Sequence, residues 1–152
     1  MGLVKKHEIA VRKKEIEDII IFIETLKNDI FYRKLTVDKI LTSPDLACLN
    51  IFLSEMASSQ VQPILQRYYS VKNAVKSKMS LHKDDWKYAD ELFGILGKTD
   101  ESSQCEIFER ILKDLRIRKK DLMEESEKMG GFYVKMWLAV GSLFVIICDY
   151  FL

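Results

Sequence analysis

Few residues of this sequence lie at the spacings that catalytic or nucleotide-binding sites require. Gly97, Lys98 and Thr99 form the Gly-Lys-Thr triplet that ends a phosphate-binding loop. Such a loop also needs an earlier glycine, where this chain has Leu92, and it connects a strand to a helix. The residues around this triplet are typical of helix instead. We therefore interpret the triplet as accidental and expect no cofactor.

The residues that bind metals or act as nucleophiles are scattered along the chain. His7 and His82 have no partner at the spacing of metal ligands, and no Cys-x-x-Cys pair occurs. Cys48, Cys105 and Cys148 are far apart and odd in number, which favours reduced thiols that pack as small apolar residues. The sequence thus predicts no catalytic or metal-binding residue and a protein that is not an enzyme. An enzyme would need a pocket that brings His7, His82 or Cys105 together with acids.

Acidic and basic residues are nearly balanced, with 24 Lys and Arg against 23 Asp and Glu. Because acids interrupt each basic cluster, we expect no nucleic-acid binding. The acidic groups at 84–85 and 124–127 are interpreted as solvated helix surface rather than paired catalytic acids. Tyr68, Tyr69 and Trp86 are interpreted as core residues, because aromatic side chains at helical spacing are usually buried.

Asp29 and Tyr32 form the strongest candidate for a partner-docking site. They are three residues apart near the end of a predicted helix, so they share one face of it. A carboxylate near a helix C-terminus opposes the helix dipole, and it therefore needs a basic partner or a role. Two interpretations stay open. In one, Asp29 pairs with a basic residue of a neighbouring helix and Tyr32 covers the core; in the other, both dock a partner protein.

The elements that carry these residues are predicted to be helices throughout. The chain has only 6 Gly and 2 Pro, and no alternating pattern indicates a strand. We predict an all-α fold, a compact bundle of about six helices followed by a single C-terminal transmembrane helix. The bundle forms a cytosolic domain over 1–129, and the transmembrane helix covers 130–152. The expected helices of the bundle are 5–34, 37–42, 44–58, 63–77, 83–96 and 99–128.

The first of these helices carries an apolar stripe at helical spacing, and its opposite face is expected to be solvated. The predicted core residues of the domain are Ile16, Ile23, Leu26, Ile30, Phe93 and Leu96. The residues expected on the solvated face of the first helix are Arg12, Lys13, Lys14, Glu15, Glu17, Asp18, Glu24 and Lys27. Gly97 is expected to end the helix over 83–96 as a left-handed cap. Gly130-Gly131 is expected to act as a hinge before the last segment; the alternative is a continuous helix, because lipid rewards hydrogen bonds within the chain.

Residues 132–152 read FYVKMWLAVGSLFVIICDYFL, with Lys135 and Asp149 as the only charged residues. About 20 mostly apolar residues suffice to cross a bilayer as a helix. The predicted membrane residues include Phe132, Trp137, Gly141, Phe144 and Ile147. Basic residues precede or open this segment and none follows it, which predicts that the domain lies on the cytosolic side. A buried C-terminal core helix is the competing interpretation.

The order of several short motifs resembles that of a known family. They are Leu26-Lys-Asn-Asp29-Ile30-Phe-Tyr32, Phe93-Gly94-Ile-Leu96-Gly97, an acidic cap at Asp100, Glu127-Lys128-Met129 at the end of a charged helix, and an apolar segment with Gly141. Together they resemble the stage III sporulation protein AB family of endospore-forming bacteria. Members of that family begin with a hydrophobic segment that residues 1–8 do not resemble. Either that segment lies upstream, or the C-terminal segment is the anchor of this chain.

The resemblance implies a non-enzymatic platform or scaffold subunit of the channel that links mother cell and forespore, required for stage III sporulation. It implies a place in the outer forespore membrane on the mother-cell side. It also implies a cytosolic domain similar to that of type II secretion system F platform proteins. The implied partners are the stage III sporulation AA ATPase, other membrane proteins of the same operon, membrane lipid and further copies of the chain. The competing function is a tail-anchored cytosolic adaptor with no transport role.

Overall fold

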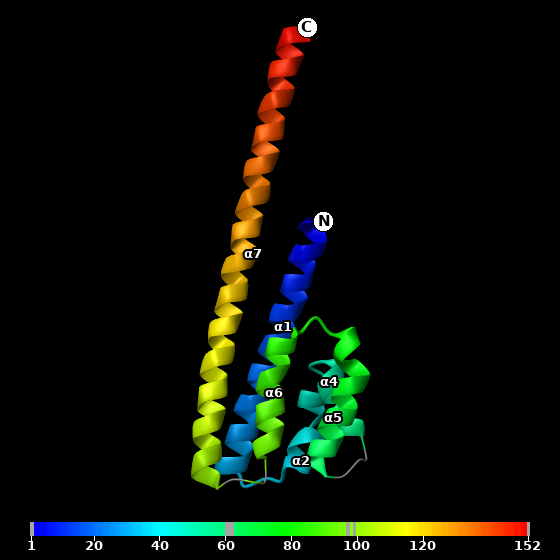
Figure 1. Cartoon of the computed structure of the whole chain (residues 1–152), viewed down its shortest axis with the longest axis vertical. Coiled ribbons are helices and arrows are strands. Elements are labelled where there is room, and N and C mark those ends of the chain that lie inside the picture. The colour runs from blue at the N-terminus through cyan, green and yellow to red at the C-terminus, as the bar shows by residue number, and fades with distance from the viewer. Residues whose placement is uncertain (1, 60–62, 97, 99, 152) are drawn as a thin grey trace.

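The structure, a computed structural model, describes residues 2–59, 63–96, 98 and 100–151 (Figure 1). Its regular elements in these ranges are all helical, and the predicted all-α fold is confirmed. The elements are α1 (Gly2–Phe31), α2 (Val37–Leu41), α3 (Pro44–Ala47), α4 (Ile51–Ser58), α5 (Ile64–Val75), the 3-10 turn η1 (Lys76–Lys78), α6 (Lys83–Ile95) and α7 (Glu101–Phe151).

The two longest helices, α1 and α7, run antiparallel along each other (Figure 1). At one end, the Lys27 ammonium of α1 pairs with Glu109 of α7. At the other end, Lys6 Nζ lies 3.7 Å from the position that a Cβ would take at Gly130. Both helices advance by the same number of residues between these two points, so their register stays constant. α7 then continues past the N-terminal end of α1.

Aromatic side chains fill the space between α1 and the shorter helices. Phe52 of α4 meets Tyr68, Trp86 and Phe93 edge-on, with ring centroids 5.7–6.1 Å apart. Phe93 of α6 stacks on Tyr68 at 4.4 Å and on Phe22 of α1 at 6.0 Å. Edge-to-face and offset pairs of this kind add to the gain from burying the rings. This cluster ties α1, α4, α5 and α6 into one core.

The helix that was predicted over 44–58 is two helices, α3 and α4. The break lies before Asn50, whose backbone is extended at φ −158°. Its side-chain oxygen accepts the N–H of Leu53 at 3.0 Å, which caps the start of α4. The cap explains why the helix restarts here; Asn50 was not predicted as a capping residue.

α7 is continuous through Gly130 and Gly131, and the predicted hinge is wrong. Each glycine costs about 1 kcal/mol relative to alanine in a helix. Continuing the helix keeps every backbone N–H and C=O bonded within the chain, which an apolar surrounding rewards. The expected cap at Gly97 lies outside the described residues. At the other end of α7, Asp100 acts as predicted: its carboxylate accepts the N–H of Ser103 at 3.1 Å, and hydrogen bonds from Ser103 lower its pKa.

The core contains five of the six side chains that we expected there, since Ile16, Ile23, Leu26, Phe93 and Leu96 are buried. Ile30 is only partly buried, because α1 ends one residue later at Phe31 and the packing thins out. Phe108 and Leu112 of α7 are also buried, and they were not among the predicted core residues. The ring of Phe108 lies 5.8 Å from that of Phe31 at the end of α1.

Truncating Ile23 or Leu26 to alanine is expected to lower the free energy of unfolding by about 2–5 kcal/mol, because each change leaves a cavity in a packed core. Ile30→Ala should cost less, since Ile30 is partly exposed. Thermal and denaturant unfolding of the detergent-solubilised chain measures these differences. Lys113→Ala, at an exposed position of α7, is the control. Parent-like stability of the Ile23 and Leu26 variants would contradict the packing of α1.

Candidate functional site

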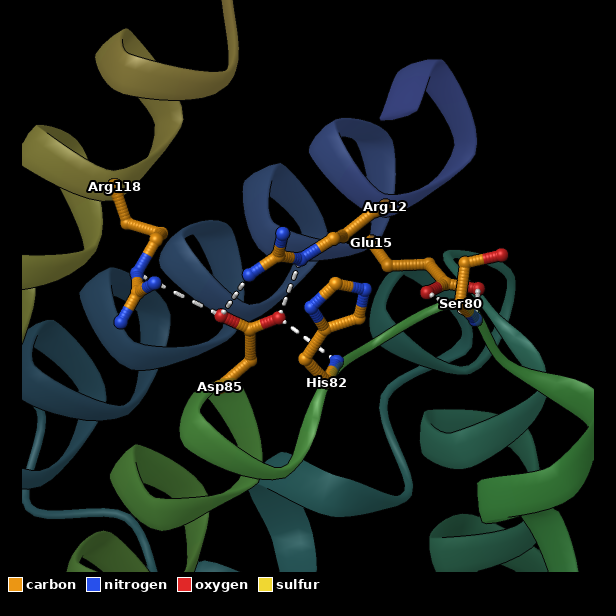
Figure 2. Close-up of polar contacts among 6 residues, drawn as sticks. All are labelled: Arg12, Glu15, Ser80, His82, Asp85 and Arg118. Atoms are coloured by element: carbon orange, nitrogen blue, oxygen red, sulfur yellow. Dashed lines mark hydrogen bonds and ion pairs between the residues drawn. The ribbon is translucent and has the colours of Figure 1, made fainter. Parts of the chain in front are cut away.

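A buried ion pair joins the first helix to the start of α6. The Asp85 carboxylate is fully buried, and it accepts two hydrogen bonds from Arg12, from Nε at 2.7 Å and from Nη2 at 3.0 Å (Figure 2). Such a two-pronged arrangement uses the planar shape of the guanidinium. Both residues were expected on solvated helix faces, and that prediction is wrong. Each charge is buried because the other lies within hydrogen-bonding distance.

Asp85 has two further neighbours. The backbone N–H of His82 donates to its Oδ2 at 2.9 Å, so the carboxylate also caps the first turn of α6. Arg118 of α7 places its Nε 3.7 Å from Oδ1, within ion-pair range (Figure 2). One carboxylate therefore connects three helices: α6, which carries it, and α1 and α7, which supply the two arginines.

A second buried carboxylate, Glu15, lies one turn of α1 away from Arg12. It accepts the backbone N–H of Ser80 at 2.9 and 3.2 Å, which holds the segment before α6 against α1 (Figure 2). Burial raises the pKa of the Glu15 carboxyl above its usual value, and the N–H groups of Ser80 and Leu81 oppose that rise. Glu15 was also expected on the solvated face of α1, and this expectation is wrong.

Asp18 is the third buried acid of this cluster and, after Glu15, the second on α1. Lys14 donates to one of its oxygens, and the Asn50 amide donates to the other at 3.3 Å. In the described part of the chain, every buried side-chain nitrogen or oxygen has a hydrogen-bond partner. The acids of this cluster are therefore engaged in holding helices together, which favours a structural role over acid–base chemistry.

The signal for this cluster was present in the sequence. Arg12 is three residues after Ile9 and four before Ile16, so it lies on the apolar stripe itself. A charged residue inside such a stripe indicates a buried charge with a partner. The partner is much harder to find, because Asp85 lies 73 residues further along the chain.

The apolar half of α7 lies outside the bundle. α7 is the sole helix among the described residues that is long and apolar enough to cross a membrane. Its most apolar stretch of 18 residues is not buried in the structure at all. Of the predicted membrane residues, Phe132, Trp137, Phe144 and Ile147 are more than half exposed, and no side chain approaches Gly141. A buried core helix, the competing interpretation, does not agree with this exposure.

The two candidate docking residues lie at the opposite end of the molecule from the apolar half of α7. Tyr32 directly follows α1 and is 79% exposed, so it does not cover the core. Asp29 is mostly buried and pairs with Arg33 of its own segment at 3.4 Å, rather than with a neighbouring helix. The internal contact that we had considered is thus absent for Tyr32, and its ring is free to meet a partner.

Among the described residues, no group of three or more His, Cys, Asp or Glu side chains is arranged so that it could hold a metal ion. Cys48, Cys105 and Cys148 are free thiols. The family is decided by comparison with known proteins: a model described as stage III sporulation protein AB matches residues 1–148. The chain belongs to the stage III sporulation protein AB family. The resemblance drawn from the sequence motifs is confirmed.

A solved structure titled "Stage III sporulation protein AB (SpoIIIAB)" supports this assignment at the level of fold. The match covers 77% of this chain and 97% of that chain, with a TM-score of 0.62 and 15% sequence identity. At this identity the likeness shows the fold alone. No curated protein matches the chain. Membership in the stage III sporulation protein AB family associates the chain with sporulation, and its exposed apolar helix associates it with a membrane.

Replacing Asp85 with Asn is expected to cost about 3 kcal/mol or more of unfolding free energy, because Arg12 then stays buried without a counter-charge. The matched control is Asp84→Asn, since Asp84 is exposed and its ion pair with Lys87 lies on the surface. Denaturant unfolding compares the two variants. A combined Arg12→Met and Asp85→Leu variant should recover part of the loss. Equal stability of both Asn variants would show that the buried pair does not hold the helices.

Proposed function

We propose that this family member is a non-enzymatic platform subunit of a membrane complex that connects mother cell and forespore in stage III of sporulation. The observation that carries the proposal is the continuity of α7. A single 51-residue helix begins within the bundle and ends in an exposed apolar segment. The domain and its membrane anchor are therefore connected rigidly by one helix.

The first half of α7 is fixed on α1 by both apolar and charged contacts. Ile111, Leu115 and Leu122 are buried against the bundle. On the rim, Arg116 donates to Glu24 at 2.6 Å and Lys119 pairs with Glu17 at 3.4 Å. A force on the domain is therefore transmitted along α7 to the membrane without a flexible joint. This is what a platform subunit needs and what an adaptor does not.

The charge distribution supports a cytosolic domain on the mother-cell side. Arg116, Arg118, Lys119, Lys120, Lys128 and Lys135 precede or open the apolar segment. Lys and Arg close to a span are retained on the cytoplasmic side. The exposed end with Tyr32 would then point away from the membrane, toward a cytosolic partner. By family, that partner is the stage III sporulation AA ATPase, together with other membrane proteins of the same operon.

An insertion after Gly131 tests whether the rigid connection matters. A flexible Gly/Ser insert of about seven residues should leave membrane attachment and domain stability unchanged but abolish sporulation, because the domain no longer moves with the span. The matched control is an alanine-rich helical insert of the same length, about two turns, which keeps the faces of α7 aligned to within about 20°. It should sporulate. Heat-resistant spore counts give the readout, and normal sporulation with the flexible insert would favour the adaptor.

Docking at the membrane-distal end is tested at Tyr32. Tyr32→Ala should leave thermal unfolding unchanged, because the side chain is exposed, and should weaken capture of the sporulation ATPase and lower spore counts. Asp29→Asn tests the neighbouring carboxylate, and Tyr69→Ala is the control for loss of a partly exposed tyrosine elsewhere. Unchanged capture by the Tyr32 variant would remove this surface from the proposal.

A further inference from the structure

We infer that the turn between α5 and α6 docks on the exposed side of α7 in a second copy of this chain. The inference rests on the proposed membrane span of α7, because copies anchored by the same helix stand side by side in the same orientation. The two surfaces, named the basic turn and the acidic face, are formed by Lys76, Lys78 and Lys83 and by Asp121, Glu124 and Glu125. Their opposite charge and their equal distance from the apolar segment carry the inference.

The basic turn has lysines without counter-charges. Residues 70–83 contain no acid, and Lys76, Lys78 and Lys83 are exposed. Among the described residues, Lys72 is the one basic side chain of this stretch with an ion pair, to Asp90 at 2.8 Å. A surface of one sign favours a partner surface of the other sign.

The acidic face is the complement. Its three carboxylates are exposed, and in the described part of the chain none of them lies within ion-pair distance of a basic group. At 3.6 residues per turn they spread over about 100° of the helix circumference. The neighbouring basic residues are engaged within the chain: Arg116 with Glu24, Arg118 with Asp85, and Lys119 with Glu17. Lys120 and Lys128 flank the face, and its three carboxylates leave it net negative.

Both surfaces lie at the same distance from the apolar segment. Glu15 of α1 holds the basic turn by accepting the N–H of Ser80 at 2.9 Å (Figure 2). Lys119 pairs with Glu17, and the helices are antiparallel, so Glu15 lies opposite Asp121. Eleven residues, or about 16 Å at 1.5 Å per residue, separate Asp121 from the start of the apolar segment at position 132. Copies anchored by α7 therefore present the turn and the face to each other at one level.

The same distance disfavours a lipid surface as the occupant. About 16 Å exceeds the reach of a lysine side chain, and it is about twice the screening length at physiological salt. The turn lies at the end of the bundle from which α7 continues, and α5 and α7 lie on different sides of the molecule (Figure 1). The turn of one copy therefore reaches the α7 of the next without displacing either bundle.

A hollow beside the acidic face suits the lysines of the turn. It is lined by Tyr88, Asp114, Ile117, Arg118 and Asp121, and Ile117 is 51% exposed. A lysine stem that covers Ile117 places its ammonium between Asp114 and Asp121. Because the turn and the face are different surfaces, the contact is head-to-tail, and a pair keeps one free surface of each kind.

Cross-linking of the full chain in vesicles tests this contact. Cys48, Cys105 and Cys148 are first replaced by alanine. A chain with Ser77→Cys is then mixed with a chain with Ile117→Cys, both of which keep every charge, in phosphatidylcholine vesicles at a low protein-to-lipid ratio. A short bis-maleimide should cross-link the mixture into dimers and leave each chain alone largely monomeric. High salt should lower the dimer yield several-fold, because the attraction is screened.

Charge reversal identifies the two surfaces. Lys76→Glu with Lys78→Glu on the Ser77→Cys chain should lower the dimer yield several-fold, and so should Glu124→Lys with Glu125→Lys on the Ile117→Cys chain. Mixing the two reversed chains should restore it. Lys39→Glu with Lys98→Glu, the matched charge change at the end of the bundle away from the span, is the control and should keep the yield. All these positions are exposed, so thermal unfolding should stay unchanged.

The outcomes separate this inference from the proposed function. Chains that stay in the vesicles through an alkaline wash but give no dimer overturn the contact and leave the span in place. Chains that the wash removes overturn the span and the proposed function. Dimers of the Ser77→Cys chain alone overturn the head-to-tail arrangement. Dimers that form only when phosphatidylglycerol is present assign the basic turn to lipid and overturn the inference, as does a yield that charge reversal leaves unchanged.

Discussion

The antiparallel pairing of α1 and α7 is the constraint on which the rest of the molecule depends. These two helices come from the two ends of the domain. Apolar side chains between Ile9 and Leu26 of α1 and between Phe108 and Leu122 of α7 are buried. The short helices α2, α4 and α5 lie beyond α1 and α6 as seen from α7 (Figure 1), and α6 also contacts α7. The aromatic cluster around Phe93 and Phe52 fills the core between these helices. The pairing also decides where the apolar half of α7 leaves the bundle, and so how the domain faces a membrane.

Charges buried next to this pairing set the position of α6. Taking ions out of water costs several kcal/mol each, and a well-packed apolar pair would serve stability as well or better. Asp85 offsets this cost by accepting hydrogen bonds from Arg12 and from the His82 backbone, with Arg118 close by. A charge pair accepts few alternative partners, whereas apolar side chains accept many. We therefore interpret the cluster as a device that selects one arrangement of three helices.

Periodicity along the sequence predicted most helices well, because their apolar stripes and caps are local features. α2, α5 and α6 begin and end within two residues of their expected bounds, and Thr36 caps α2 by accepting the N–H of Lys39. The buried charges were missed because their partners lie far along the chain, and periodicity carries no information on which helices will meet. The exposure of Tyr32 could not be predicted from the sequence either, because it depends on where α1 ends relative to α7.

The pairing of the first helix with the last has a consequence for how the chain folds. The ion pair from Arg116 to Glu24 closes a loop of 92 residues, and contacts so distant in sequence form slowly because the entropy of closure is lost before they form. During synthesis, the apolar stripe of α1 has no α7 to cover it until most of the domain has left the ribosome. A nascent chain with Ile16, Ile23 and Leu26 uncovered is a natural client for chaperones. The same order makes the domain intolerant of early termination, because a chain that stops before α7 lacks half of its central helix pair.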